Sequence, residues 1–282
     1  MNTKFSYIDL IRRRSSRRSY KPEVLSDKIQ EQINQIIVTI PAGPFGTDSS
    51  FRLIRKSIAA DQKIKLGTYG FISGAQYFIV GKTVSGTEAF IDFGYRMEWI
   101  ILKLTGLELG TCWLGGTFTR SEFARLVNLQ ENEVIPAITP VGHATEKRSI
   151  RDRLIRLGAG SKNRKPWLEI FFNGDFNHPS DNKQIGDYST VLEMVRLAPS
   201  ASNKQPWRVV QSDNACHFYL QRTAGYSRMF PAIDLQQVDI GIAMGHFELS
   251  ARELQLSGHW QIADPGIVHP EGTEYILSWV FE

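Results

Sequence analysis

The feature that most constrains the fold of this chain is an internal repeat of 22 residues. The segment DFGYRMEWIILKLTGLELGTCW spans residues 92–113, and DIGIAMGHFELSARELQLSGHW spans residues 239–260. Both begin with aspartate, a hydrophobic residue and glycine, continue with an apolar pattern typical of a helix, and end in tryptophan. The repeat predicts two similar halves, each with a long central helix.

A second pair of similar segments occurs in the same order. Residues 36–54 and residues 194–210 each read as the end of a helix, a proline-bearing loop and a strand. Two matches in one order favour a tandem duplication over a chance likeness. We therefore predict a first half over residues 1–175 and a second, shorter half over residues 176–282.

Local patterns predict an α+β protein. Ser6 (in SYID) and Ser26 are candidate caps of short helices, and TRSE at residues 119–122 resembles another capping box. Runs rich in β-branched and aromatic residues predict strands, because such side chains suit a pleated, half-buried surface. The predicted strands are FRLI (51–54), QYFIVG (76–81), PAITPVG (136–142), WRVVQ (207–211), HFYLQ (217–221) and YILSWVFE (275–282).

Composition limits the class of protein. The net charge of +4 over 282 residues is too small to indicate a nucleic-acid-binding protein by itself. The only cysteines are Cys112 and Cys216, so we expect no disulfide framework and a cytoplasmic location, with Cys112 a small buried residue. No signal peptide and no uninterrupted apolar run of membrane-spanning length are recognisable, so we expect a soluble protein.

The two halves differ in their polar segments. The run RRRSSRRSY (12–20) and a basic, Gly/Ser-punctuated arm (144–165) occur only in the first half. The amide-rich loop PSASNKQPW (199–207) occurs only in the second half, where the first half has PAGPFGTDSSF (41–51). Arginine and serine suit phosphate oxygens, and amide side chains suit a flat heteroaromatic ring. This inventory favours a phosphorylated planar cofactor over a polymer.

Several common catalytic motifs do not fit. GKT at 81–83 follows a predicted strand, and Gln76 stands where a phosphate-binding loop needs glycine. There is no GxSxG motif of a serine hydrolase. The six histidines lack the spacing of metal ligands, so we predict no metal site.

The polar segments resemble those of the FMN-dependent nitroreductase family. Its Arg-x-Ser-x-Arg-x-aromatic motif resembles Arg14–Tyr20, and its Ala-Pro-Ser-x-x-Asn-x-Gln-Pro-Trp motif resembles Ala198–Trp207. A Leu-Gly-Thr-Cys-Trp loop at Leu109–Trp113 and a basic element at Lys162–Pro166 are similar to further family features. The Pro-Ser-x-x-Asn-x-Gln-Pro-Trp string is the most specific of the four.

The resemblance implies a nitroreductase-like fold in which two fused halves form an intramolecular pseudo-dimer. Family members are usually homodimers whose FMN sites take residues from both subunits, so here one composite site and one degenerate site are implied. No side-chain acid or base is implied, because the flavin does the chemistry. The implied FMN contacts are Arg14, Ser15, Ser16, Arg18, Thr68, Tyr69, Gly115, Gly116, Lys162, Arg164, Pro199, Ser200, Ala201, Asn203 and Gln205.

The function implied by the resemblance is an oxidoreductase with bound FMN. NAD(P)H would reduce the flavin, and a small acceptor such as a nitro compound or a quinone would then reoxidise it in a ping-pong cycle. Two alternatives stay open: a non-catalytic FMN-binding protein with a degenerate site, and a nucleic-acid-binding protein that uses the two basic stretches. We expect one FMN per chain, no nucleic acid or membrane partner, and a monomer, because fusion already supplies the dimer interface.

Overall fold

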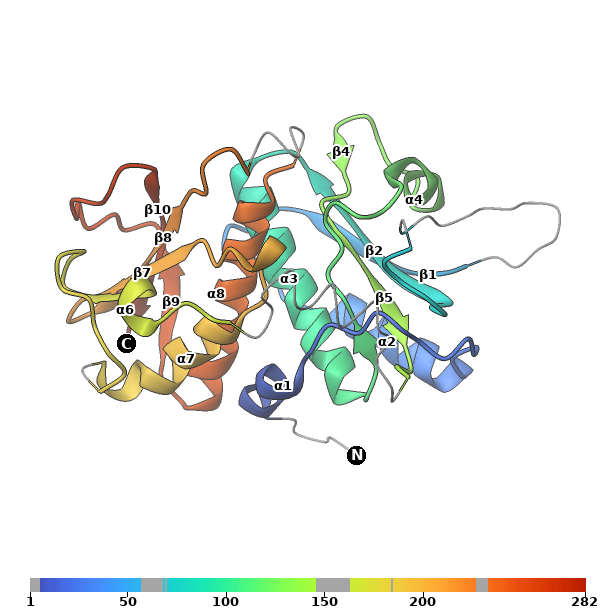
Figure 1. Cartoon of the computed structure of the whole chain (residues 1–282), viewed down its shortest axis with the longest axis horizontal. Coiled ribbons are helices and arrows are strands. Elements are labelled where there is room, and N and C mark those ends of the chain that lie inside the picture. Colours follow the sequence, from blue (N-terminus) through green and yellow to red (C-terminus); the bar gives the residue numbers. More distant parts are fainter. Residues whose placement is uncertain (1–5, 57–67, 69, 146–162, 184, 227–232) are drawn as a thin grey trace.

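The computed structural model describes residues 6–56, 68, 70–145, 163–183, 185–226 and 233–282 (Figure 1). These residues form an α+β fold with two sheets. The helices are α1 (Tyr7–Arg13), α2 (Asp27–Thr39), α3 (Thr87–Gly106), α4 (Arg120–Leu126), α6 (Trp167–Ile170), α7 (Ser189–Leu197) and α8 (Leu235–Glu253), with 3-10 turns η1 (Gly186–Tyr188) and η2 (Ala201–Asn203). The strands are β1 (Ser49–Arg55), β2 (Tyr77–Val84), β3 (Gly110–Thr111), β4 (Glu133–Val134), β5 (Ile138–Gly142), β6 (Phe171–Asn173), β7 (Trp207–Gln211), β8 (Ala215–Gln221), β9 (Gly258–Gln261) and β10 (Thr273–Phe281).

The two sheets share a common strand pattern. The first has the order β1-β2-β5-β3 with β4 added to β2, and the second has the order β6-β7-β8-β10-β9. In each, an antiparallel strand pair precedes the long helix, and the strand after the helix lies at an edge. The additional strand β6 runs parallel to β7, although its residues precede the predicted boundary at 175. The duplication and that boundary stay predictions.

The long helices of the two repeats lie side by side between the sheets (Figure 1). The glycine of each repeat permits this approach, because a side chain there would meet the backbone of the other helix. A Cβ on Gly94 would lie 2.1 Å from the carbonyl oxygen of Val238, and one on Gly241 would lie 1.8 Å from that of Ile91. The Asp-x-Gly start of each repeat therefore has a packing reason.

The structure confirms the predicted strands and two of the three helix caps. Each predicted run lies largely within a strand, from β1 to β10. The hydroxyl oxygen of Ser6 accepts from the backbone N–H of Asp9, and that of Ser26 accepts from Ile29. Thr119 precedes α4 but makes no side-chain cap hydrogen bond, so the predicted capping box is wrong in that detail.

The core surrounds the paired helices and extends over both faces of the first sheet. In β2, Tyr77 and Ile79 face the main core, whereas Phe78 and Val80 face a second cluster with Phe123 of α4. A strand buried on both faces requires a continuous apolar run, and the sequence YFIV provides it. Cys112 and Cys216 are buried free thiols, and among the described residues no helix is long and apolar enough to cross a membrane.

Candidate functional site

The amide-rich loop after α7 has an unusual backbone. Ser202, Asn203 and Gln205 have φ angles of 50°, 55° and 49°, in the left-handed region that residues other than glycine rarely adopt. The Ser200 hydroxyl accepts from the backbone N–H of Gln205 at 2.8 Å and closes the turn. A left-handed backbone costs free energy and persists only where surrounding contacts hold it. Such residues are found most often at ligand-binding and catalytic sites. The loop is therefore a candidate binding element on structural grounds.

The described end of the basic arm is hydrogen-bonded to this loop. Arg164 donates through one nitrogen to Oδ1 of Asn203 and through the other to the carbonyl oxygen of Leu197 at 2.9 Å. Oε1 of Gln205 accepts from the backbone N–H of Lys165 at 2.8 Å, and Nδ2 of Asn203 donates to the carbonyl oxygen of Asn163 at 2.8 Å. Two segments that the sequence assigns to one ligand therefore meet, and the two amide side chains hold them together.

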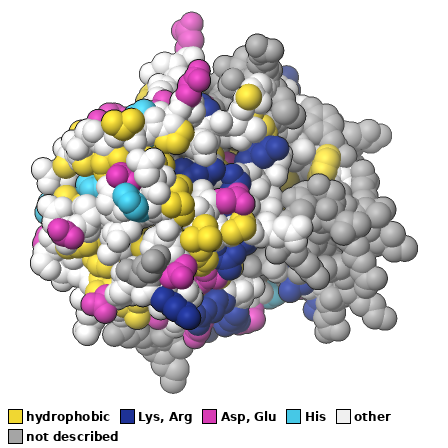
Figure 2. All heavy atoms as spheres, turned by 60° about the vertical axis from the view of Figure 1, so that its left-hand side comes forward, with side chains coloured by type: hydrophobic (Ala, Val, Ile, Leu, Met, Phe, Trp, Pro, Cys, Tyr) yellow, Lys and Arg dark blue, Asp and Glu magenta, His cyan; other side chains and the backbone are white. Residues whose placement is uncertain are grey.

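Positive charge gathers where the arm and the loop meet. Burial lowers the pKa of Lys165, and the charges of Arg208 and Lys204 lower it further against an opposing effect of Glu169. Burial also lowers the pKa of Arg208 to about 10. Figure 2, in which the side with the second sheet comes forward, shows Lys and Arg side chains gathered toward the middle of the view. Positive charges close enough to lower the pKa of Lys165 favour an anionic ligand.

The arginine–serine run follows α1 along the edge strand of the first sheet. Ser16 forms a bridge with Thr111 of β3, and the carbonyl oxygen of Arg18 accepts from the backbone N–H of Ser73 at 2.9 Å. The Arg14 side chain is 8% exposed, and its Nε lies 3.7 Å from Oε1 of Glu98 on α3. Arg14 is therefore an almost fully buried cation rather than part of a solvated basic surface.

Glu98 connects this run to the second half. The carboxylate is fully buried, and it accepts from Nε1 of Trp113 at 2.6 Å. Its Oε1 lies 2.9 Å from Nε2 of His246 on α8, and Nδ1 of His246 donates to the carbonyl oxygen of Met194 on α7 at 2.9 Å. Both ring nitrogens of His246 therefore face an oxygen atom, one on α3 and one on α7. The cluster joins α1, α3, α7 and α8.

Three residues on one face of α8 contact predicted site residues or connect to them through a neighbour. Leu235, Asp239 and His246 are four and seven residues apart, so they lie on the same side of the helix. A Cβ on Gly115 would lie 2.8 Å from Cδ2 of Leu235, and the backbone N–H of Ala201 donates to Oδ1 of Asp239 at 2.9 Å. His246 connects to Arg14 through Glu98. The glycine loop, the amide-rich loop and the arginine–serine run thus lie along this face in that order.

For the remaining predicted site residues, the structure says less about a role in the site. Tyr69 and Lys162 lie outside the described residues. Thr68 is 7% exposed and accepts through its carbonyl oxygen from the backbone N–H of Phe71 at 2.8 Å. Among the residues that the structure describes, no hydrogen bond joins Thr68 or Gly116 to the amide-rich loop. Ser15 and Pro199 are half-buried beside the segments already described.

The sequence analysis did not identify three residues that organise this region: Glu98, Asp239 and His246. A signal for Glu98 was available, because one acidic residue stands within the apolar run MEWIIL, where an unpaired charge is costly. Asp239 opens the second repeat, and its conserved place in both repeats was a second signal within the chain. No signal pointed to His246, whose partner lies 148 positions away.

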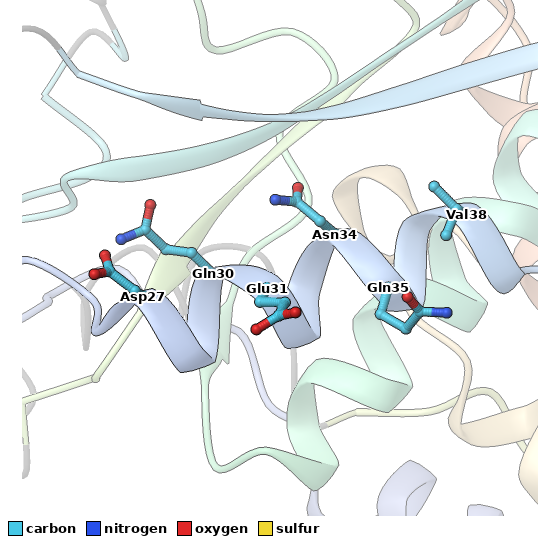
Figure 3. A pocket seen from close by; sticks show the side chains of 6 residues that line it. All are labelled: Asp27, Gln30, Glu31, Asn34, Gln35 and Val38. Atoms are coloured by element: carbon cyan, nitrogen blue, oxygen red, sulfur yellow. The ribbon is translucent and has the colours of Figure 1, made fainter.

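A hollow on the outer surface is not part of this region. Its lining consists of six residues that all belong to α2, and their side chains are mostly polar and exposed (Figure 3). None of the predicted site residues lies there. The lining residues are Asp27, Gln30, Glu31, Asn34, Gln35 and Val38.

Comparison with known proteins identifies a family and a fold. A family model described as "Putative TM nitroreductase" matches residues 7–251. The crystal structure of a "putative nitroreductase" from Thermotoga maritima has a TM-score of 0.64 at 17% identity, covering 99% of this chain and 95% of that one. The fold is therefore nitroreductase-like. A search of curated proteins finds no match.

Shorter nitroreductase structures match part of this chain. A nitroreductase with bound FMN from Desulfitobacterium hafniense covers 52% of this chain and 93% of its own, with 19% identity and a TM-score of 0.41. A "putative nitroreductase" in complex with FMN from Desulfovibrio desulfuricans covers 54% and 97%, with 22% identity and a TM-score of 0.40. Each spans about half of this chain.

Proposed function

Because this chain belongs to the "Putative TM nitroreductase" family, we propose that it is an FMN-dependent oxidoreductase. In this proposal NAD(P)H is the electron donor, and the acceptor is a small organic molecule such as a nitro compound or a quinone. The chain binds one FMN in a composite site and acts as a monomer. A cytoplasmic location is part of the proposal and is supported by the two free cysteines.

The observation that carries this proposal is the contact between the basic arm and the amide-rich loop. Arg164 and Asn203 are 39 positions apart and are hydrogen-bonded side chain to side chain. A phosphate-binding arm and a ring-binding loop have a reason to meet when one ligand carries both a phosphate and a ring. FMN is such a ligand, and the left-handed residues of the loop are consistent with a strained binding element.

The donors near the site fit a phosphate group. Guanidinium groups form bidentate hydrogen bonds with phosphate, and serine hydroxyls complete its coordination. The Nε atom of Arg14 is buried without a hydrogen-bond partner among the described residues, so the cluster has a donor to spare. We assign the phosphate to Arg14, Ser15, Ser16, Arg18, Lys162 and Arg164, and the ring and ribityl chain to Thr68, Tyr69, Gly115, Gly116, Pro199, Ser200, Ala201, Asn203 and Gln205.

The protein's own contribution is charge, position and exclusion of water. When bound, FMN would supply hydride acceptance from the nicotinamide and onward electron transfer. Lys165, Lys204 and Arg208 provide positive potential beside the loop, which favours an anionic ligand. The loop is held from both sides, by Asp239 beneath Ala201 and by Arg164 at Asn203, so its shape is set before any ligand arrives.

A visible spectrum of the purified chain tests the proposal. We expect flavin absorbance, either as isolated or after incubation with FMN, at one flavin per chain. A colourless protein that takes up no FMN would refute the function, and a ratio near two would refute the single composite site. Steady oxidation of NAD(P)H with a quinone or nitro acceptor separates the enzyme from a non-catalytic FMN-binding protein.

A matched pair of arginine variants tests the phosphate assignment. Arg164→Gln should weaken FMN binding by about tenfold or more, since a charge-assisted hydrogen bond to phosphate is lost. Riboflavin, which lacks the phosphate, should lose less affinity than FMN, because for riboflavin only the contact of Arg164 with the loop is lost. Arg196→Gln on α7 is the control, because Arg196 donates its side-chain hydrogen bonds within the described part of the chain to Glu193. Equal losses for FMN and riboflavin would refute the phosphate contact and leave Arg164 acting through the loop alone.

A further inference from the structure

Asp239 lies directly beneath the amide-rich loop. It belongs to the second turn of α8, is 2% exposed, and accepts from the backbone N–H of Ala201 at 2.9 Å. We propose that Asp239 is a positioning residue for the FMN site. As a neutral carboxylic acid, Asp239 holds the loop in its binding conformation. This inference rests on the proposed function.

The hydrogen bonding of Asp239 argues for the neutral form. Oδ1 has one backbone donor, and Oδ2 is buried without a partner among the residues that the structure describes. A carboxylate in such a place would be an almost unsolvated charge, whereas the protonated acid carries none. Burial raises the pKa of Asp239 well above its ordinary value, the charge of Asp234 adds to this, and the N–H of Ala201 opposes it.

The neighbours of Asp239 contribute no compensating cation. Asp234, at the N-terminus of α8, is acidic and is itself paired with Arg222. Tyr226 faces the carboxyl from the segment after β8, and burial raises the pKa of its phenol against an opposing hydrogen bond with Ser202. The Tyr226 hydroxyl lies 3.3 Å from that of Ser202 in the loop. Within the described part of the chain, no Lys, Arg or His forms an ion pair with Asp239.

The place of Ala201 explains why this hydrogen bond would matter for a ligand. Ala201 begins the turn η2 and immediately precedes two of the left-handed residues, Ser202 and Asn203. Their conformation costs free energy, so contacts on either side must fix it. Arg164 fixes the far side at Asn203, and Asp239 fixes the near side. Release of the near side should let the loop relax and lose its shape.

Two substitutions at Asp239 separate this role from a general packing role. Asparagine has the shape and the accepting oxygen of the neutral acid, so Asp239→Asn should bind FMN within about threefold of the wild type. Leucine fills a similar space but accepts no hydrogen bond, so Asp239→Leu should bind FMN about tenfold more weakly. A loss in Asp239→Asn as large as in Asp239→Leu would overturn the proposal, as would wild-type affinity in Asp239→Leu.

A pH titration of FMN affinity decides the matter even if Asp239→Leu does not fold. Ionisation of Asp239 at alkaline pH should disturb the loop, so wild-type affinity should fall there while that of Asp239→Asn stays level. Identical profiles for the two proteins would overturn the neutral-acid role. If the wild type bound no FMN at any pH, the proposed function would fail first; if it bound FMN and both variants matched it, only this inference would fail.

Discussion

The two repeats place an aspartate at the same point of their long helices, and the loops above the two aspartates differ. In the first half, Asp92 accepts from the backbone N–H groups of Phe45 and Thr47, at 3.0 and 2.8 Å, and from the Thr47 hydroxyl at 2.9 Å. In the second half, Asp239 accepts only from Ala201. Both oxygens of Asp92 are satisfied, whereas Oδ2 of Asp239 has no partner among the described residues.

We interpret the loop over Asp92 as closed for stability, and the difference supports the proposal that the loop over Asp239 binds a ligand. The loop over Asp92 contains Gly43, where a Cβ would lie 2.2 Å from the aspartate side chain, so the backbone presses against the carboxylate. The loop over Asp239 keeps three left-handed residues and is held by a distant arginine instead. The contrast supports the proposal of one composite site and one flavin per chain.

The largest expected effect concerns the glutamates of the two helices. Glu98 is fully buried with Arg14 and His246, whereas Glu248 accepts from Tyr95 and Trp260 and pairs with Arg252, whose side chain is 64% exposed. Glu98→Gln should destabilise the fold by about 3–5 kcal/mol, because it leaves the buried guanidinium of Arg14 without its anionic partner.

Glu248→Gln is the matched control for Glu98→Gln. It should cost about 1 kcal/mol, since an amide oxygen still accepts from the phenol and the indole, and Arg252 can turn to water. Urea unfolding of both variants measures the difference. Equal costs would mean that the buried Arg14–Glu98 pair adds no more to stability than the Arg252–Glu248 pair at the surface.

The next effect concerns what the halves share, the close crossing of α3 and α8. Gly241→Ala should cost about 3 kcal/mol, because the new Cβ would lie 1.8 Å from the carbonyl oxygen of Ile91 and the helices would have to separate. Gly245→Ala should be neutral or slightly stabilising, since its Cβ would lie 3.5 Å from the carbonyl oxygen of Tyr95 and alanine favours helix. Similar unfolding midpoints for the two variants would argue against the tight crossing.

The sequence predicted those parts of the fold that depend on local patterns. The apolar runs of β2 and β7, the serine caps and the two long helices follow from periodicity and short-range hydrogen bonding. Thr119 shows the limit, because its φ and ψ of −84° and 96° lead into α4 without the cap hydrogen bond that TRSE suggests. A motif gives the donor and the acceptor but does not set their geometry.

The site was predicted in composition and only partly in geometry. The sequence indicated that Arg164 and Asn203 belong to one site, and the structure joins them. It did not indicate that Asn203 and Gln205 bind the arm, or that Arg14 is buried against Glu98. These contacts join residues that lie far apart in the sequence, and no short segment encodes them.

A smaller effect tests the loop over Asp92. Asp92→Asn should cost about 2 kcal/mol, because the amide nitrogen would face one of three hydrogen-bond donors and could not accept. Asp239→Asn at acidic pH is the matched control and should cost little. Chemical unfolding compares the two. If Asp92→Asn were as stable as the wild type, the carboxylate would not be closing the first loop.

The smallest effect, counted per pH unit, is the change in the free energy of unfolding that the titration of Asp239 causes. Its folded-state pKa is raised above the ordinary 3.8, so its contribution to stability is fully present below that pH and is lost as pH rises through the folded pKa. Between the two values, the wild type should lose about 1.4 kcal/mol per pH unit relative to Asp239→Asn, because the folded state keeps a proton that the unfolded state has released. Urea unfolding of both proteins at several pH values measures the gap. A gap that stayed constant with pH would place an ionised carboxylate under the second loop, and the contrast with Asp92 would then be one of hydrogen-bond number alone.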